Sequence, residues 1–147
     1  MILDAQNQFS AAQAVTSTAV STNVIDLSQA REVFAGEEVE IAISVDVAAT
    51  AAGAATVQFQ VITSTSSAMS SPTIVVQTDA IPKTALTQYA RFSICVPSAF
   101  INNLGQRYMA IQYTVATGPL TAGSFTAAVV ADWNDVPKYY TSGYAVL

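Results

Sequence analysis

Apolar side chains recur at every second position along several short stretches of this chain, and this spacing predicts half-buried β-strands. Residues 38–46 give the clearest example, because their valines and isoleucines fall on one face and their charged or small residues on the other. Residues 23–27 show a weaker version of the pattern. The same alternation predicts further strands at 56–63, 73–78, 89–96, 107–116 and 124–133.

Turn-forming residues separate these stretches. Turn signals lie at 63–72, which is rich in serine and threonine, at 81–83 around Pro82, and at 118–123, which holds two glycines and a proline. Gly36 precedes the first long strand. Many short strands joined by turns and longer connections predict an all-β fold, an antiparallel β-sandwich. The pattern fits a jelly roll and other Greek-key arrangements alike.

Two internal segments interrupt the strand pattern. Residues 97–105 place Ser98 before a short apolar run and Gly105 after it, which predicts one short helix. The alanine-rich residues 48–55 contain Gly53 and lie between two predicted strands, so we interpret them as a connecting loop.

The ends of the chain differ from its centre. Residues 1–22 hold few large apolar side chains and are predicted to form an N-terminal arm, either laid across a neighbouring subunit or flexible. Residues 23–133 form the predicted sandwich domain. Residues 134–147 make a C-terminal extension whose tyrosine content is unusual for a disordered tail. We therefore expect this extension to dock on another surface.

The composition of the chain points to assembly. Charged residues make up 10% of its 147 residues, against roughly 25% in typical soluble domains, and hydrophobic residues make up 52%. The length suits one domain. No stretch approaches the roughly 20 uninterrupted apolar residues of a spanning helix, so we expect no membrane partner. A free monomer would have few solubilising groups, which predicts association with other subunits.

The charge of the chain argues against nucleic acid as a partner. The formal net charge is −5 and the pI is near 4.2, whereas nucleic-acid sites need clustered lysine and arginine. The basic residues are instead scattered along the sequence: Arg31, Lys83, Arg91, Arg107 and Lys138.

The start of the chain lacks the basic stretch and apolar core of a secretory signal, so we expect synthesis in a cytoplasm.

Candidate catalytic chemistry is sparse. The chain contains no histidine, the usual general base, and Cys95 is its only cysteine, which we interpret as a small core residue of a strand. The acidic residues of 38–46 are interpreted as a solvated sheet face, and Asp132 and Asp135 as part of a turn. We therefore expect a non-enzymatic protein without metal or cofactor. A hydrolase acting through Asp132 or Asp135 is the weakest alternative.

Two sets of aromatic residues receive different interpretations. The first set lies inside predicted strands and is interpreted as core: Phe59, Phe92, Tyr113 and Phe125. The second set is interpreted as candidate interface residues, because large aromatic side chains dominate binding hot spots. These candidates are Phe9, Trp133, Tyr139, Tyr140 and Tyr144.

Several short motifs follow one another along the chain. The first are Leu-Asp-Ala-Gln-Asn-Gln-Phe-Ser at 3–10 and Ser-Thr-Asn-Val-Ile-Asp-Leu at 21–27. The remaining motifs are Thr-Ala-Ala-Gly-Ala-Ala-Thr at 50–56, Ser-Ser-Pro-Thr at 70–73, Arg-Tyr at 107–108 and Tyr-Thr-Val-Ala-Thr-Gly-Pro-Leu-Thr-Ala-Gly at 113–123. In this order the motifs resemble the cement, or decoration, proteins of tailed-bacteriophage capsids of the Bordetella-phage type, and the resemblance ends before residue 134.

The resemblance implies a jelly-roll subunit that carries no catalytic residues. It implies a structural virion protein on the exterior of the phage head, made in the cytoplasm of the bacterial host. Such a protein clamps adjacent major capsid proteins of the HK97-like fold. The expected partners are therefore the phage major capsid protein and further copies of the chain, as a homodimer or, alternatively, a trimer.

A carbohydrate-binding β-sandwich of a phage tail or of a secreted protein is the main alternative. In that case Tyr108, Trp133 and the C-terminal tyrosines would stack on sugar rings. A cement protein should bind capsids and ignore sugars, so a glycan screen separates the two hypotheses.

Overall fold

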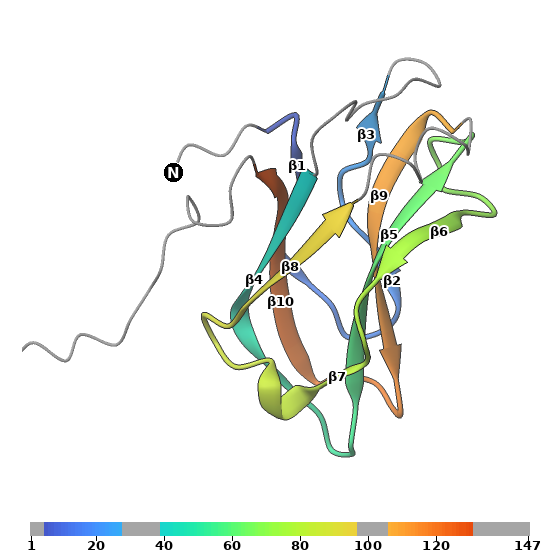
Figure 1. The fold of residues 1–147 in the computed structure, drawn as a ribbon. Coiled ribbons are helices and arrows are strands. Elements are labelled where there is room, and N and C mark those ends of the chain that lie inside the picture. The colour runs from blue at the N-terminus through green and yellow to red at the C-terminus, as the bar shows by residue number, and fades with distance from the viewer. Residues whose placement is uncertain (1–4, 28–38, 97–105, 131–147) are drawn as a thin grey trace, which may run out of the picture.

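The computed structural model describes residues 5–27, 39–96 and 106–130. These residues form two antiparallel β-sheets packed face to face (Figure 1). Sheet A contains, in spatial order, β1 (Gln8–Ala14), β10 (Ala122–Val130), β4 (Val39–Thr50) and β8 (Arg91–Val96). Sheet B contains, in spatial order, β2 (Ala19–Val20), β9 (Tyr108–Ala116), β5 (Thr56–Ser64) and β6 (Thr73–Gln77). Two short strands extend sheet B. Strand β3 (Ile25–Asp26) pairs with β9, and strand β7 (Ile81–Pro82) pairs with β5. A 3-10 turn, η1 (Lys83–Ala85), follows β7.

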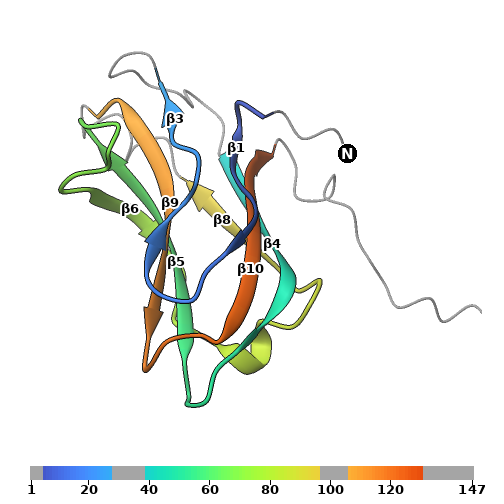
Figure 2. The same ribbon diagram turned by 180° about the vertical axis from the view of Figure 1, so that it is seen from behind.

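The strand order is that of a jelly roll. The first strands of the chain pair with the last, β1 with β10 in sheet A and β2 with β9 in sheet B (Figure 2). The middle strands β4 and β5 lie next to those late strands in their respective sheets. This nesting is the double Greek key of a jelly roll. The predicted antiparallel sandwich is confirmed, and the strand order distinguishes the jelly roll from other Greek-key folds.

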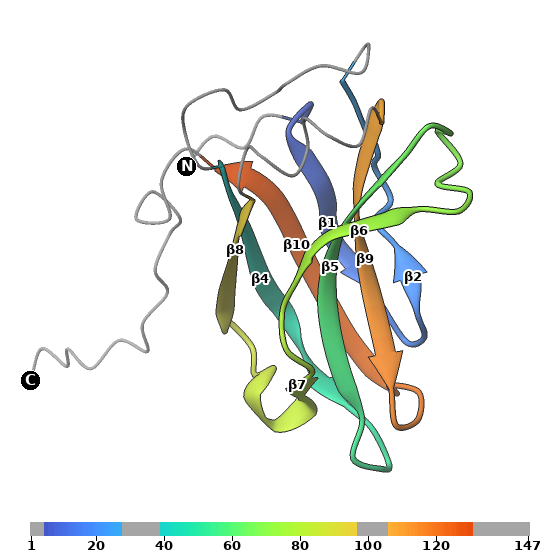
Figure 3. The same ribbon diagram turned by 45° about the vertical axis from the view of Figure 1, so that its right-hand side comes forward.

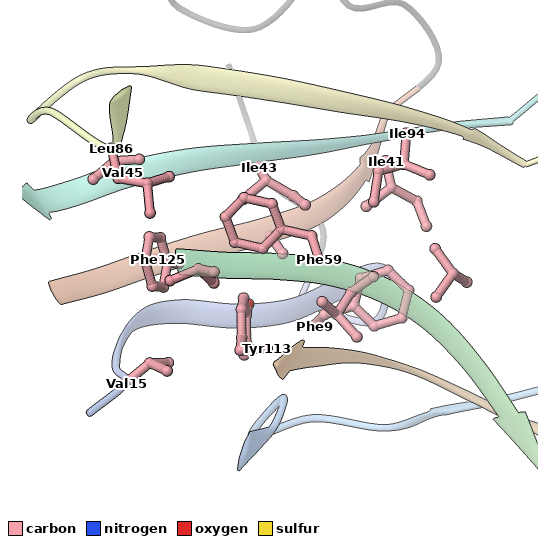
Figure 4. Packing of buried hydrophobic residues seen from close by; sticks show 14 of the residues in the cluster. Phe9, Val15, Ile41, Ile43, Val45, Phe59, Leu86, Ile94, Tyr113 and Phe125 are labelled. Atoms are coloured by element: carbon pink, nitrogen blue, oxygen red, sulfur yellow. The ribbon is translucent and has the colours of Figure 1, made fainter. Parts of the chain in front are cut away.

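The core lies between the sheets, where inward side chains of both sheets meet (Figure 4). The Phe59 ring makes edge-on contacts with Tyr113 and Phe125, at centroid distances of 5.9 and 5.4 Å. Tyr113 and Phe125 stack at 5.5 Å. Phe92 is half-buried, with its ring 5.7 Å from Phe59. The predicted aromatic core is therefore confirmed.

Strand β1 corrects the prediction of an N-terminal arm. Residues 8–14 are paired with β10 along the edge of sheet A, so this part of the chain belongs to the sandwich. Register shifts between Gln8 and Ser10, and between Ser10 and Gln13, interrupt the period of two. Both Phe9 and Ser10 consequently have 0% of their surface exposed. The predicted interface role of Phe9 is corrected too, because its side chain packs in the core.

Strand register corrects two smaller predictions. Strand β4 continues to Thr50, so it includes the first residues of the loop predicted at 48–55. Cys95 lies opposite Glu40 and is exposed, whereas Ile94 beside it is buried. The cysteine therefore occupies the outward face of its strand and not the core.

Several predictions lie outside the described residues. They are the short helix at 97–105, the turn containing Asp132 and Asp135, and the C-terminal extension at 134–147. Within the part of the chain that the structure describes, no helix has the length and apolar character needed to span a bilayer.

Candidate interaction surface

The outer face of sheet B is the side of that sheet turned away from the core. Side chains alternate along a strand, so the residues between inward-facing Phe59 and Val61 of β5 point outward. Strands β6, β5 and β9, which carry this face, are neighbours (Figure 3). The face comprises Gln58, Gln60 and Ile62 on β5, Ile74 and Gln77 on β6, and Ala110, Gln112 and Thr114 on β9.

A series of side-chain hydrogen bonds, here named the amide chain, crosses this face from β9 to β6. Gln112 Nε2 donates to Thr114 Oγ1 at 3.4 Å, and Thr114 Oγ1 donates to Gln60 Oε1 at 2.8 Å. Gln60 Nε2 donates in turn to Gln77 Oε1 at 2.8 Å. The first bond joins two residues of β9 and the next two cross to β5 and β6. From Gln112 to Gln77 each group donates to the next, so the bonds polarise one another in the same sense. The amide chain ends at the edge strand on Gln77.

Gln58 supports the middle of the amide chain. Its Nε2 donates to the carbonyl oxygen of Thr78 at 2.7 Å, and its Oε1 accepts a longer bond of 3.3 Å from Gln60 Nε2. Gln60 is only 7% exposed, and a buried amide without partners would be costly. The neighbouring amides and hydroxyl therefore make the outward position of Gln60 stable.

A small apolar cluster, separate from the core, lies beside the amide chain. The loop after β5 places Met69 on it, and this loop is held by a bond of 2.9 Å from Ser64 Oγ to the carbonyl oxygen of Ser70. Ile74 lies opposite Ile62 on the edge strand and is 49% exposed. The cluster consists of buried Ile62, Met69 and Ala110, with half-buried Val20, Val24 and Tyr108 packed against them.

An ion pair borders the outer face of sheet B. Arg107 Nε and Nη2 each donate to one carboxylate oxygen of Asp26, both at 2.7 Å. The hydrogen bond to Asp26, together with Coulomb attraction, raises the pKa of Arg107. The guanidinium also lies 5.2 Å from the centre of the Tyr108 ring. Both charged side chains are nearly half exposed, so solvent screens the pair and its contribution to stability is small.

The outer face of sheet A has a different character. Glu40 and Asp46 of β4 and Arg91 of β8 alternate with inward-facing residues and therefore point outward. Asp46 Oδ2 accepts a hydrogen bond of 2.7 Å from Thr126 Oγ1. By contrast, the eight residues that define the outer face of sheet B include no charged side chain. The two faces thus offer partners different electrostatic environments.

Of the predicted interface residues, the structure describes Phe9 alone, and its side chain is in the core and not on the outer face of sheet B. Trp133, Tyr139, Tyr140 and Tyr144 lie outside the described residues. The sequence did carry one signal for this face, because glutamines alternate with apolar residues in β5. Within the described ranges, no group of three or more histidine, cysteine or acidic side chains is placed to hold a metal ion.

Comparison with known proteins identifies a family. A protein-family model described as Bbp16 matches residues 9–129, which run from β1 to β10. This name suggests a protein of a Bordetella phage, in agreement with that part of the resemblance found in the sequence. No curated protein matches the chain.

Proposed function

Because this chain belongs to the Bbp16 family, we propose that it is a non-enzymatic structural virion protein, a capsid cement protein of a phage head. It binds the outer surface of the head, bridges neighbouring major capsid subunits of the HK97-like fold and so stabilises the shell. The observation that carries this proposal is the family match, which spans nearly all of the jelly roll.

Cementing requires a binding surface and no chemical step. A protein that binds two capsid subunits, and prefers the assembled shell to free subunits, stabilises the shell by mass action. The outer face of sheet B supports this role, because its hydrogen-bonding groups are uncharged and adjoin an apolar cluster. Protein interfaces commonly combine an apolar centre with polar groups of this kind.

Self-association would strengthen the hold on the shell. A homodimer with two capsid footprints makes its second contact intramolecular, so interfaces of about 1,600 Å² or less can bind firmly together. A trimer would act in the same way. The partners under this proposal are the major capsid protein and further copies of the chain, with no role for nucleic acid or lipid.

The test is cryo-electron microscopy of particles from the parent virus. We expect the jelly roll on the outside of the head, in contact with two capsid subunits at once. Heads that lack the protein should also disassemble at a lower temperature than complete heads. A head surface without this jelly roll would contradict the proposal.

A carbohydrate-binding module is the second candidate function. The observation that favours it is the row of amide and hydroxyl groups on the outer face of sheet B, which suits sugar hydroxyls. However, sugars also stack on open aromatic faces, and Arg107 already lies over the Tyr108 ring. Binding to a glycan array without binding to phage heads would favour this second candidate.

A further inference from the structure

The amide chain leaves one donor unused at the edge of sheet B. Gln77 Oε1 accepts from Gln60, but Gln77 Nε2 has no partner in the described part of the chain. Each group of the amide chain donates to the next and the series ends on this amide, which increases the partial positive charge on its free N–H groups. The exposed end of Gln77 therefore suits a hydrogen-bond acceptor from another molecule.

The backbone N–H and C=O of Gln77 point away from β5, toward the edge of the sheet. The N–H of the next residue, Thr78, donates to the carbonyl oxygen of Phe59 at 3.0 Å, so Thr78 turns its peptide groups toward β5. Peptide groups alternate in direction along an antiparallel strand, which directs the N–H and C=O of Gln77 away from β5. Among residues 5–27, 39–96 and 106–130, strand β6 pairs with β5 alone, so these groups lie on the edge of the described sheet.

Two neighbouring side chains define what could occupy this edge. Ile74 is 49% exposed and presents an apolar surface. Asp79 is also exposed, and among the described residues no cation pairs with its carboxylate. A register shift beside Val61, where Val75 is left unpaired, limits regular pairing to the part of the edge around Gln77.

We propose that this edge, named here the β6 edge (Ile74, Gln77 and Asp79), docks a short extended segment of a neighbouring capsid subunit. This inference rests on the proposed function. The segment pairs its backbone with Gln77, supplies a carbonyl oxygen to Gln77 Nε2 and places an apolar side chain on Ile74. A lysine or arginine of the segment lies opposite Asp79, because that carboxylate and the net charge of −5 favour a basic partner.

Two substitutions test the β6 edge in the full chain, by co-sedimentation with phage heads that lack the protein. Ile74→Asp removes the apolar contact, and Gln77→Glu removes the Nε2 donor while it keeps the acceptor for Gln60. We expect each to weaken head binding by about tenfold or more, which is typical of a central interface contact. The thermal unfolding of both variants should match that of the wild type, because both side chains are exposed.

Val47→Asp is the matched control. Val47 is 50% exposed, nearly the same as Ile74, but it belongs to β4 of the opposite sheet. We expect Val47→Asp to bind heads as the wild type does. An equal loss of binding in Val47→Asp and Ile74→Asp would overturn the docking site, as would undiminished binding by Ile74→Asp.

The outcomes also separate this inference from the proposed function. If the wild type binds heads and both β6-edge variants bind equally well, the docking site is wrong and the cement function stands. If the wild type does not bind heads, both proposals fail. Conversion of a dimer to a monomer by Ile74→Asp would assign the β6 edge to a second copy of the chain and overturn the inference.

Discussion

The hydroxyl oxygens of Tyr113 and Ser10 lie 2.6 Å apart, so this hydrogen bond joins strand β9 of sheet B to strand β1 of sheet A through the core. Ser10 Oγ also donates to the carbonyl oxygen of Phe125 at 3.2 Å and accepts from the N–H of Ala127 at 3.1 Å. A serine hydroxyl has a single proton, so the tyrosine must be the donor to Ser10. One hydroxyl thus links three strands.

The first prediction concerns the stability of the protein at high pH. Burial raises the pKa of Tyr113 to about 12; the hydrogen bond with Ser10 lowers the pKa in part, and the charge of Asp46 raises it further. In the unfolded chain the Tyr113 hydroxyl ionises near its ordinary pKa of about 10, and in the folded chain it ionises at higher pH. Tyr113 therefore contributes its full stability below pH of about 10. This contribution, roughly 2 to 3 kcal/mol, is lost as the pH rises through about 12.

The measurement is urea unfolding of the wild type and of Tyr113→Phe, near neutral pH and at successive steps up to pH of about 12. We expect the wild type to lose more stability than Tyr113→Phe over the alkaline range. The phenylalanine variant controls for the titration of the other tyrosines. Parallel losses in the two proteins would show that Tyr113 titrates alike in the folded and unfolded states.

A second prediction compares two buried serines. Ser10→Ala leaves the N–H of Ala127 and the hydroxyl of Tyr113 without their shared partner, so we expect a loss of about 1 to 3 kcal/mol. Ser124 is also buried, but its Oγ has no hydrogen-bond partner, so Ser124→Ala should be neutral or stabilising. Urea unfolding of the two variants measures this difference. Equal losses of stability would contradict the hydrogen bonds assigned to Ser10.

A third prediction tests the position of Phe9. Its side chain is fully buried among core residues of both sheets, so Phe9→Ala should lower the free energy of unfolding by roughly 3 to 5 kcal/mol. Phe9→Leu should cost less, because it keeps most of the buried volume. Thermal unfolding of the isolated chain measures both. A stable Phe9→Ala variant with impaired assembly would instead restore the interface role predicted from the sequence.

A fourth prediction concerns salt. Charged residues make up only 10% of the chain, and the outer face of sheet B carries its hydrogen bonds on neutral groups. Ions screen contacts between charges and leave neutral hydrogen bonds and apolar contacts largely unaffected. We expect head binding to change by no more than a few-fold between roughly 50 mM and 500 mM sodium chloride. A steep loss of binding over this range would indicate a charged interface.

A fifth prediction concerns residues 134–147. Strand β10 ends at Val130, and the core residues found in the described part of the chain all precede this segment. We expect a chain truncated after Trp133 to unfold at nearly the same temperature as the full chain, but to assemble or bind heads less well. Unfolding of the truncated chain at ordinary temperature would contradict this division.

The strands with large alternating apolar residues could be predicted well. The segment predicted at 56–63 is strand β5, Thr56–Ser64, because its valines and Phe59 keep a strict period of two. Strand β1 was missed because Phe9 is its only large apolar residue and two register shifts break the period. Small side chains and bulges remove the local signal of a strand while long-range pairing still forms it.

The candidate surface was harder to predict than the fold. The outward glutamines of β5 are visible in the sequence as the polar half of an alternating pattern. The hydrogen bonds among them are not visible in the sequence, because the contact of Gln60 with Gln77 and Thr114 depends on the register of three strands. The open donor of Gln77 follows only from this connection. Local patterns therefore identify which residues face outward, and strand pairing decides what they form together.

The pairing of β1 with β10 has a consequence for how the protein is made. The hydrogen bond from Ser10 to Phe125 joins residues 115 positions apart, so the first long strand leaves the ribosome well before its partner has been translated. Until then, Phe9 has no completed core to enter, and contacts this distant in sequence form slowly. A nascent chain that stops before β10 cannot close sheet A, so this jelly roll completes its folding only after β10 has been synthesised.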